Sequence, residues 1–298
     1  MNKKIKSSLA ETVLASSLVL LPSITLAAQV ATDPGDYSPL PAGVDLGILY
    51  YQHTTHEKLY ASGHEISNLA GIEKLTTDIG LLRWVHYTQI GGFTIDPQII
   101  IPFGEVSLKT GGGNIRSSGV GDPIVGGTVW LHNDPETKRA FGITALASLP
   151  IGQYDAEKGA VNVGENRWKL ITQAGYVTPL SDTISLDLIA EYTFFGDNDD
   201  FAGRKKEQQN QYGVQAHLSK SIAAMTKVTL SYYHDFGGET SLDGTDLDDE
   251  LSNSRWQGTF AHFIAPDIQL QLQYGRSLEV KNGFSEEDRI NFRLVKVF

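Results

Sequence analysis

The chain has 298 residues, no cysteine, 30 glycines and a formal net charge of −11 at pH 7. Because nucleic-acid phosphates attract patches of lysine and arginine, this acidic balance argues against nucleic acid as a partner. Without cysteine there are no disulfides, so an exported protein of this kind would draw its stability from a core or from a closed barrel, which has no free sheet edge.

The first 28 residues resemble a secretory signal and are predicted to be removed after export. Lysines at positions 3, 4 and 6 precede an apolar run over residues 13–21, and residues 25–28 offer small side chains for cleavage. A membrane-anchoring helix would need about 20 apolar residues, whereas this run is shorter and is broken by Pro22. Residues 29–43 contain three prolines and are predicted to be an irregular leader before the folded domain, residues 44–298.

Residues 44–298 divide into about twelve segments of roughly 10–13 residues that have the composition of strands. Apolar side chains alternate with polar ones over residues 183–194 and 268–274, for example. Because successive side chains of a strand point to opposite faces, each such segment is predicted to have one apolar face. In the first segment this pattern puts Leu46, Ile48 and Tyr50 on the apolar face and Asp45 on the other. In five segments the sequence does not decide which side chains point outward. One of them is residues 81–88, where Arg83 breaks the alternation.

The connections between these segments alternate between long and short. The long ones are residues 53–76, 109–119, 152–166, 196–208 and 237–252, and the short ones are 90–92, 133–136, 179–182, 221–225 and 265–267. Transmembrane barrels have short periplasmic turns, long outer loops and an even number of strands, whereas a Greek-key sandwich has no reason to alternate in this way. We therefore predict an all-β fold, a single antiparallel transmembrane β-barrel of about 12 strands, located in the cell outer membrane of a Gram-negative bacterium.

The last segment, residues 288–298, is amphipathic and ends on Phe298. This ending resembles the C-terminal assembly signal of bacterial outer-membrane barrels. We therefore predict that Phe298 is the assembly signal and that the barrel-assembly machinery is a partner. Aromatic residues near the ends of many segments are predicted to form girdles at the two membrane interfaces.

If the apolar faces meet lipid, the opposite faces line the lumen. The predicted lumen-lining charges are Asp45, Asp96, Asp187, Glu191, Asp235, Arg255, Arg289 and Arg293. Charges of both signs could pair across the interior and shape its field, or could only solvate and brace the wall. A twelve-strand barrel lies between filled and open types, so the passage is predicted to be narrow and partly closed by loops or by residues 29–43.

Four stretches resemble the outer-membrane β-barrel family named for the meta-pathway of phenol degradation, a family of transporters. They are Leu40-Pro41-Ala42-Gly43, Gly119-Val120-Gly121-Asp122-Pro123, Leu149-Pro150-Ile151-Gly152-Gln153-Tyr154-Asp155 and Asn162-Val163-Gly164-Glu165-Asn166-Arg167-Trp168. The resemblance implies a barrel associated with uptake of aromatic or hydrophobic compounds. It transfers no set of substrate-binding residues.

Three patterns of histidine could suggest an enzyme or a metal site. The spacing of His217 and Ser219 is similar to the His-x-Ser pair of outer-membrane phospholipases, but the predicted parity faces the lumen, whereas lipid cleavage needs a site facing the bilayer and an activated serine. The adjacent His234 and Asp235 point to opposite faces, and the histidines at positions 53, 56 and 64 are predicted to be solvated on a long loop. We predict no catalytic residue, no metal site and no cofactor.

The predicted function is passive uptake of small hydrophobic or aromatic compounds through an outer-membrane channel. The alternative is a structural or adhesive barrel with acidic loops, such as residues 243–250, that contact a surface; an outer-membrane hydrolase is less favoured. The predicted partners are outer-membrane lipid and lipopolysaccharide, the barrel-assembly machinery and a small hydrophobic or aromatic solute. An excess of lumen carboxylates predicts a preference for cations among ions.

Overall fold

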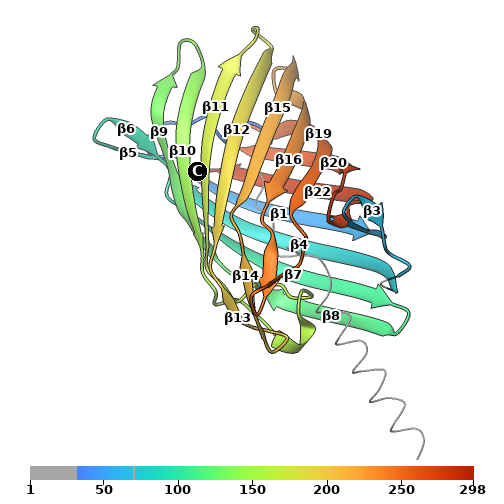
Figure 1. The fold of residues 1–298 in the computed structure, drawn as a ribbon. Coiled ribbons are helices and arrows are strands. Elements are labelled where there is room, and N and C mark those ends of the chain that lie inside the picture. The colour runs from blue at the N-terminus through green and yellow to red at the C-terminus, as the bar shows by residue number, and fades with distance from the viewer. Residues whose placement is uncertain (1–31, 70) are drawn as a thin grey trace, which may run out of the picture.

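The computed structural model describes residues 32–69 and 71–298, and within them twelve long antiparallel strands form a closed barrel (Figure 1). The predicted signal segment lies outside the described residues. Among the residues described, no helix has the length and apolar character needed to cross a membrane.

The barrel strands follow one another around the wall in chain order. They are β1 (Asp45–His56), β4 (Ile72–His86), β7 (Gln98–Thr110), β9 (Ile124–Asp134), β10 (Arg139–Ser148), β11 (Lys169–Pro179), β12 (Ile184–Phe195), β15 (Gln211–Ala223), β16 (Thr226–Gly237), β19 (Leu251–Ala265), β20 (Ile268–Glu279) and β22 (Asp288–Val297). The last strand pairs with the first from Leu46 opposite Val297 to Thr55 opposite Asp288, which closes the barrel. Backbone hydrogen bonds between Phe298 and Asp45 extend this seam to the C-terminus.

The long connections carry short strands of their own. At the end of the barrel that holds these loops lie β2 (Lys58–Ala61), β3 (His64–Glu65) and β21 (Gly283–Ser285) in one small sheet, and β13 (Asn198–Phe201), β14 (Arg204–Gln208), β17 (Thr240–Leu242) and β18 (Thr245–Asp246) in another. A single 3-10 turn, η1 (Ala156–Lys158), lies in the connection between β10 and β11. Because transmembrane barrels have long outer loops and short periplasmic turns, this end is the outer one.

Two connections differ from the predicted ones. The glycine-rich stretch 109–119 is largely a strand, β8 (Gly113–Val120), which pairs with the outer half of β7. As a result, β7 pairs with β9 over only three residue pairs at its inner end. The predicted tight turn at residues 90–92 is the tip of a hairpin, β5 (Thr88–Ile90) and β6 (Phe93–Ile95), which projects from the turn end of the barrel (Figure 1).

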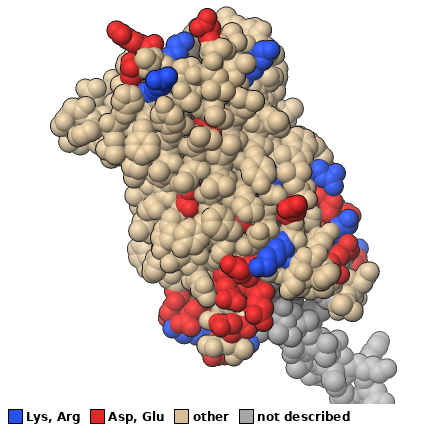
Figure 2. All heavy atoms as spheres, turned by 45° about the horizontal axis from the view of Figure 1, so that its top comes forward, with Lys and Arg blue, Asp and Glu red and all other residues tan. Residues whose placement is uncertain are grey.

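The outer face of the barrel is apolar. Large apolar side chains such as Leu188, Leu230, Phe260 and Leu272 are exposed on it, and charged residues gather toward the two ends of the molecule, leaving a broad and largely uncharged band between them (Figure 2). A closed barrel with such a band satisfies its backbone internally and presents hydrocarbon to lipid. The predicted outward faces of β12, β16, β20 and β22 are therefore the ones found.

The facing of β1 is the reverse of the prediction. Leu46, Ile48 and Tyr50 are buried inside the barrel, whereas Leu49 and Tyr51 are exposed. The interior is itself apolar here, since β1 packs with buried side chains of β4, β7, β9 and β10 in one hydrophobic cluster. Both faces of the strand are thus apolar, and polarity alone does not reveal its orientation.

The lumen consequently has two unlike sides. Its apolar side is built by β1, β4 and their neighbours up to β10. Its polar side is built by β15 to β22, whose buried side chains include Gln215, His217, Ser219, Thr229, Ser231, Gln257, Thr259, Gln271, Gln273 and Asn291. A solute inside the barrel meets apolar side chains mixed with a few polar ones, such as Thr128 and Thr144, on one wall and mainly hydrogen-bonding groups on the other.

Candidate functional site in the barrel lumen

The described part of the leader, residues 32–43, enters the lumen and contacts both of its sides. The Thr32 amide donates to Gln215 Oε1 on β15 at 3.3 Å, and the Gly35 amide donates to Asp187 Oδ2 on β12 at 2.8 Å. On the other side, Trp130 Nε1 of β9 donates to the Tyr37 carbonyl at 3.0 Å. Contacts from three strands spread around the wall place this segment across the passage.

Tyr37 anchors the segment to β10 and β11. Its side chain is buried, and its hydroxyl lies 2.8 Å from Thr144 Oγ1 and donates to Gln173 Oε1 at 3.1 Å. The ring lies flat against the backbone of Gly175, where an added Cβ would come within 2.3 Å of the ring carbons. Only glycine leaves room for this approach, because any other residue carries a Cβ.

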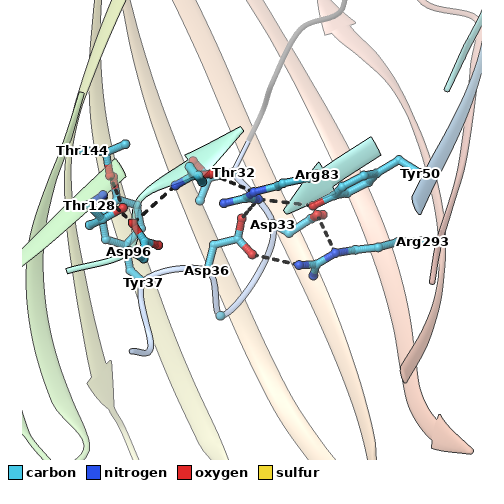
Figure 3. A network of polar contacts seen from close by, with 12 residues as sticks. Thr32, Asp33, Asp36, Tyr37, Tyr50, Arg83, Asp96, Thr128, Thr144 and Arg293 are labelled. Atoms are coloured by element: carbon cyan, nitrogen blue, oxygen red, sulfur yellow. Dashed lines mark hydrogen bonds and ion pairs between the residues drawn. The ribbon is translucent and has the colours of Figure 1, made fainter. Parts of the chain in front are cut away.

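Two carboxylates of the leader face two arginines of the wall (Figure 3). Asp36 lies 2.9 Å from Arg83 Nη1 on β4 and 3.3 Å from Arg293 Nη2 on β22. Asp33 lies 3.5 Å from Arg293 Nε and accepts a hydrogen bond of 2.7 Å from Gln273 Nε2. These groups are largely buried, and buried charges are tolerated when they are paired and hydrogen-bonded as here.

The charge of Asp36 is maintained by its partners. Burial raises the pKa of this carboxyl, but the two nearby guanidinium groups of Arg83 and Arg293 outweigh burial, and the pKa lies below its ordinary value. Since a lowered pKa favours the ionised form, the ion pairs persist throughout the neutral range.

A cavity adjoins the leader, with Thr32 and Asp33 in its wall and about 430 Å³ of empty space that includes open solvent. Its lining is mixed and mainly polar: besides amide side chains such as Gln257 and Asn291, it contains Leu81, Ile100, Tyr50, Tyr233, Arg255 and Arg289. The Arg255 guanidinium lies 3.5 Å from the centroid of the Tyr233 ring, an arrangement in which the cation is attracted by the aromatic face. This mixed lining offers apolar and polar contacts to a small organic molecule.

Comparison with known proteins identifies the family of this barrel. The model of the family described as "Putative MetA-pathway of phenol degradation" matches residues 60–294. The chain belongs to this family. An outer membrane channel from Pseudomonas putida F1 is 37% identical and has a TM-score of 0.84, over 90% of this chain and 100% of that chain. The protein is thus an outer-membrane β-barrel channel.

More distant structures share less with this member of the phenol-degradation family. A Pseudomonas aeruginosa FadL homologue is 8% identical with a TM-score of 0.43, over 86% of this chain and 89% of that chain. A TodX monoaromatic hydrocarbon channel is 11% identical with a TM-score of 0.48, over 89% and 92% of the two chains. These likenesses carry no argument about solutes. The comparison with curated proteins gives no match.

In this family member, the predicted inward charges lie on the interior faces of their strands with one exception. Asp187 and Glu191 on β12, Asp235 on β16, Arg255 on β19 and Arg289 and Arg293 on β22 all share the parity of buried neighbours, and Asp96 is buried beside Thr128 near the turn end. Asp45 was predicted wrongly. It shares the outward parity of Leu49 and lies 2.9 Å from His86 Nδ1, because the interior beside β1 is apolar.

Sequence reasoning missed the leader's partners. Asp33, Asp36 and Tyr37 carry no pattern in the sequence, since their roles depend on wall residues far away along the chain. Arg83 did leave a signal, because it interrupts the alternation of its segment, and its side chain reaches Asp36 inside the barrel. A single cationic residue on an otherwise apolar inward face indicates that a buried anionic partner lies near it inside the barrel.

His217 and Ser219, which resemble the His-x-Ser pair of phospholipases, are not arranged for hydrolysis. His217 Nδ1 lies 2.9 Å from Ser231 Oγ, and Ser219 Oγ lies 2.8 Å from Thr229 Oγ1, so each residue pairs with β16 and neither with the other. Both face the interior, away from lipid. Within residues 32–69 and 71–298, no group of three or more histidines and carboxylates could hold a metal ion.

Proposed function

We propose that this channel conducts small hydrophobic or aromatic molecules passively across the outer membrane and performs no chemistry of its own. The observation that supports this most is the cavity beside the leader, whose lining includes Leu81 and Ile100 together with Tyr233 and Arg255. An apolar wall favours a hydrocarbon ring, because burial of apolar area drives transfer from water. The polar wall accommodates a hydroxyl or a similar group by hydrogen bonding.

The leader makes the passage selective by narrowing it. Residues 32–37 contact β9, β10, β11, β12, β15 and β22, so a solute passes through the space that this segment leaves. We expect this narrowing to exclude large hydrophilic molecules by size and to favour solutes no larger than a single aromatic ring. We also propose two partners at the membrane. Lipopolysaccharide would contact the acidic outer loops, and the barrel-assembly machinery would recognise Phe298.

Uptake by liposomes tests the proposal. Purified protein in vesicles should speed the entry of phenol, an uncharged aromatic solute, with no energy source and far more than that of a disaccharide. Ile100→Thr should slow phenol entry, because it places a hydroxyl in the apolar wall of the cavity. Ile124→Thr is the matched control, since Ile124 is equally buried but lies outside the cavity. Vesicles that neither conduct ions nor take up phenol would favour a structural barrel instead.

A further inference from the structure

A second pocket lies outside the barrel wall strands, beneath the outer loops. It is partly open, with about 350 Å³ of empty space that includes solvent, and it shares none of its lining residues with the lumen cavity. Its walls come from the connection between β10 and β11 and from the hairpin of β13 and β14. The side chains in its lining are Tyr154, Ala160, Asn162, Glu165, Arg167, Asn198, Phe201 and Lys206.

One carboxylate in this pocket already has two cations. Glu165 accepts hydrogen bonds from Arg167 Nε and Nη2 at 2.9 and 2.7 Å, and from Lys169 Nζ at 2.5 Å. Burial raises the pKa of Glu165, but Lys169 and Arg167 outweigh it and hold the pKa at about 2. Glu165 is therefore ionised, and each of its two oxygens already accepts from a cation.

Two buried cationic side chains of the pocket have donor atoms that make no hydrogen bond within the described residues. Arg167 is 4% exposed, and its Nη1 makes no hydrogen bond within the described residues. Lys206 is 8% exposed, and its Nζ lies 4.8 Å from the Phe201 ring centroid, with no hydrogen bond or ion pair to any residue the structure describes. The carboxylate of Asp249 is held by the Thr240 amide and hydroxyl at 2.7 and 2.6 Å. Since a buried donor without a hydrogen-bond partner is costly, an incoming anion that accepts from Arg167 Nη1 and Lys206 Nζ would be stabilised in the pocket.

The remaining lining suits a planar ring. Phe201 and Tyr154 place aromatic side chains in the wall, and Gly159 and Gly164 expose backbone without side chains. Tyr154 is fixed in place, because its hydroxyl donates to the Asp200 carbonyl at 3.0 Å and accepts from Asn198 Nδ2 at 2.9 Å. Aromatic rings attract one another in stacked or edge-on arrangements.

We propose that this outer-loop pocket is a binding site for a small aromatic carboxylate, whose anionic group contacts Arg167 Nη1 and Lys206 Nζ and whose ring packs against Phe201 and Tyr154. A carboxylate matches these donors, because charge-assisted hydrogen bonds to guanidinium and ammonium groups are strong and directional. The site would collect such anions at the cell surface, although the surrounding loops are themselves acidic.

The charge of Lys206 gives the site a pH dependence. Burial lowers the pKa of this amine to about 7, and Arg167 also lowers it, whereas Glu165 and Asp249 raise it. Below pH 7 the free pocket holds a protonated Lys206 and attracts an anion; above pH 7 the amine is neutral before the ligand arrives. Affinity for a carboxylate should therefore fall as the pH rises from 6 to 8.

Binding of sodium benzoate to the purified full chain in detergent, measured by titration calorimetry at pH 6, tests the site. Benzoate should bind saturably, and benzyl alcohol and inorganic phosphate should bind more weakly. Lys206→Gln should weaken benzoate binding by about tenfold or more, the factor expected for one charge-assisted hydrogen bond. Lys205→Gln is the matched control, because Lys205 is the neighbouring residue of β14 and pairs at the surface with Asp197 and Glu207.

A second variant tests the aromatic wall separately from the cations. Phe201→Leu keeps the cations and removes the ring, and it should weaken benzoate more than it weakens acetate. The folded state of each variant is verified by its heat-modifiable gel mobility. The proposal is overturned by equal benzoate affinity in wild type and Lys206→Gln, by benzyl alcohol or phosphate binding as tightly as benzoate, or by no saturable binding at all. The readout is binding, so these outcomes do not depend on transport.

Discussion

Gly175 lets the Tyr37 ring of the leader pack closely against β11. A Cβ at this position would lie within 2.3 Å of the Tyr37 ring, so Gly175→Ala should push the ring off β11 and loosen the leader. We expect a larger single-channel conductance in planar bilayers. Gly258→Ala on β19 is the control, because its Cβ would meet nothing nearer than 3.7 Å. If the two variants conducted alike, Tyr37 would not hold the leader in place.

At the residue scale, the sequence predicted which charged side chains point inward better than it predicted the residues with which they pair. The inward positions of Asp187 and Glu191 followed from regular alternation on β12. The pairing of Asp36 with Arg83 could not be predicted, because it joins an irregular segment to a strand and depends on closure of the whole barrel. The Glu165 cluster was equally hidden, although Glu165 and Arg167 stand in a stretch quoted for its family resemblance.

Depth in the membrane should decide the cost of a charge on the outer face of β12. Leu188 and Phe194 are both exposed on this face, but Leu188 lies near the middle of the strand and Phe194 near its outer end. Leu188→Arg should destabilise the barrel by roughly 2–4 kcal/mol and Phe194→Arg by about 0–1 kcal/mol, as found for cations at the midplane and interface. Reversible urea unfolding in lipid vesicles measures both. Equal costs would mean that the facing or the membrane depth of β12 is misassigned.

At the element scale, strands were predictable wherever one face was polar. The strands β12, β16, β20 and β22 alternate between lipid and a polar lumen, so polarity fixed their orientation. The strand β1 has lipid on one side and an apolar interior on the other, and its orientation was therefore reversed. Similarly, β8 was taken for a loop because its glycine and serine residues lack alternation, although its backbone pairs fully with β7.

At the scale of the whole molecule, closure of the barrel brings charges that are far apart in the sequence together around the lumen, where they act jointly on a permeating ion. The leader brings Asp33 and Asp36 against Arg83 and Arg293, so these charges nearly cancel where the leader crosses the lumen. The carboxylates of Asp187, Glu191 and Asp235 remain on the opposite arc of the wall. A cation preference, as predicted from the sequence, thus depends on the leader as much as on the strands.

Neutralising the leader should therefore reverse part of this selectivity. The double variant Asp33→Asn with Asp36→Asn keeps the side-chain shapes but leaves Arg83 and Arg293 without counter-charges, and arginine stays protonated at all accessible pH values. Permeability should shift toward anions whether the altered leader stays in the lumen or leaves it, because the two carboxylates are lost in both cases. The reversal potential under a potassium chloride gradient in planar bilayers measures the shift. Asp246→Asn is the control, since Asp246 is exposed on β18 in the outer loops and removes one charge remote from the passage. A reversal potential of the double variant equal to that of the wild type would show that the leader's carboxylates do not act on permeating ions.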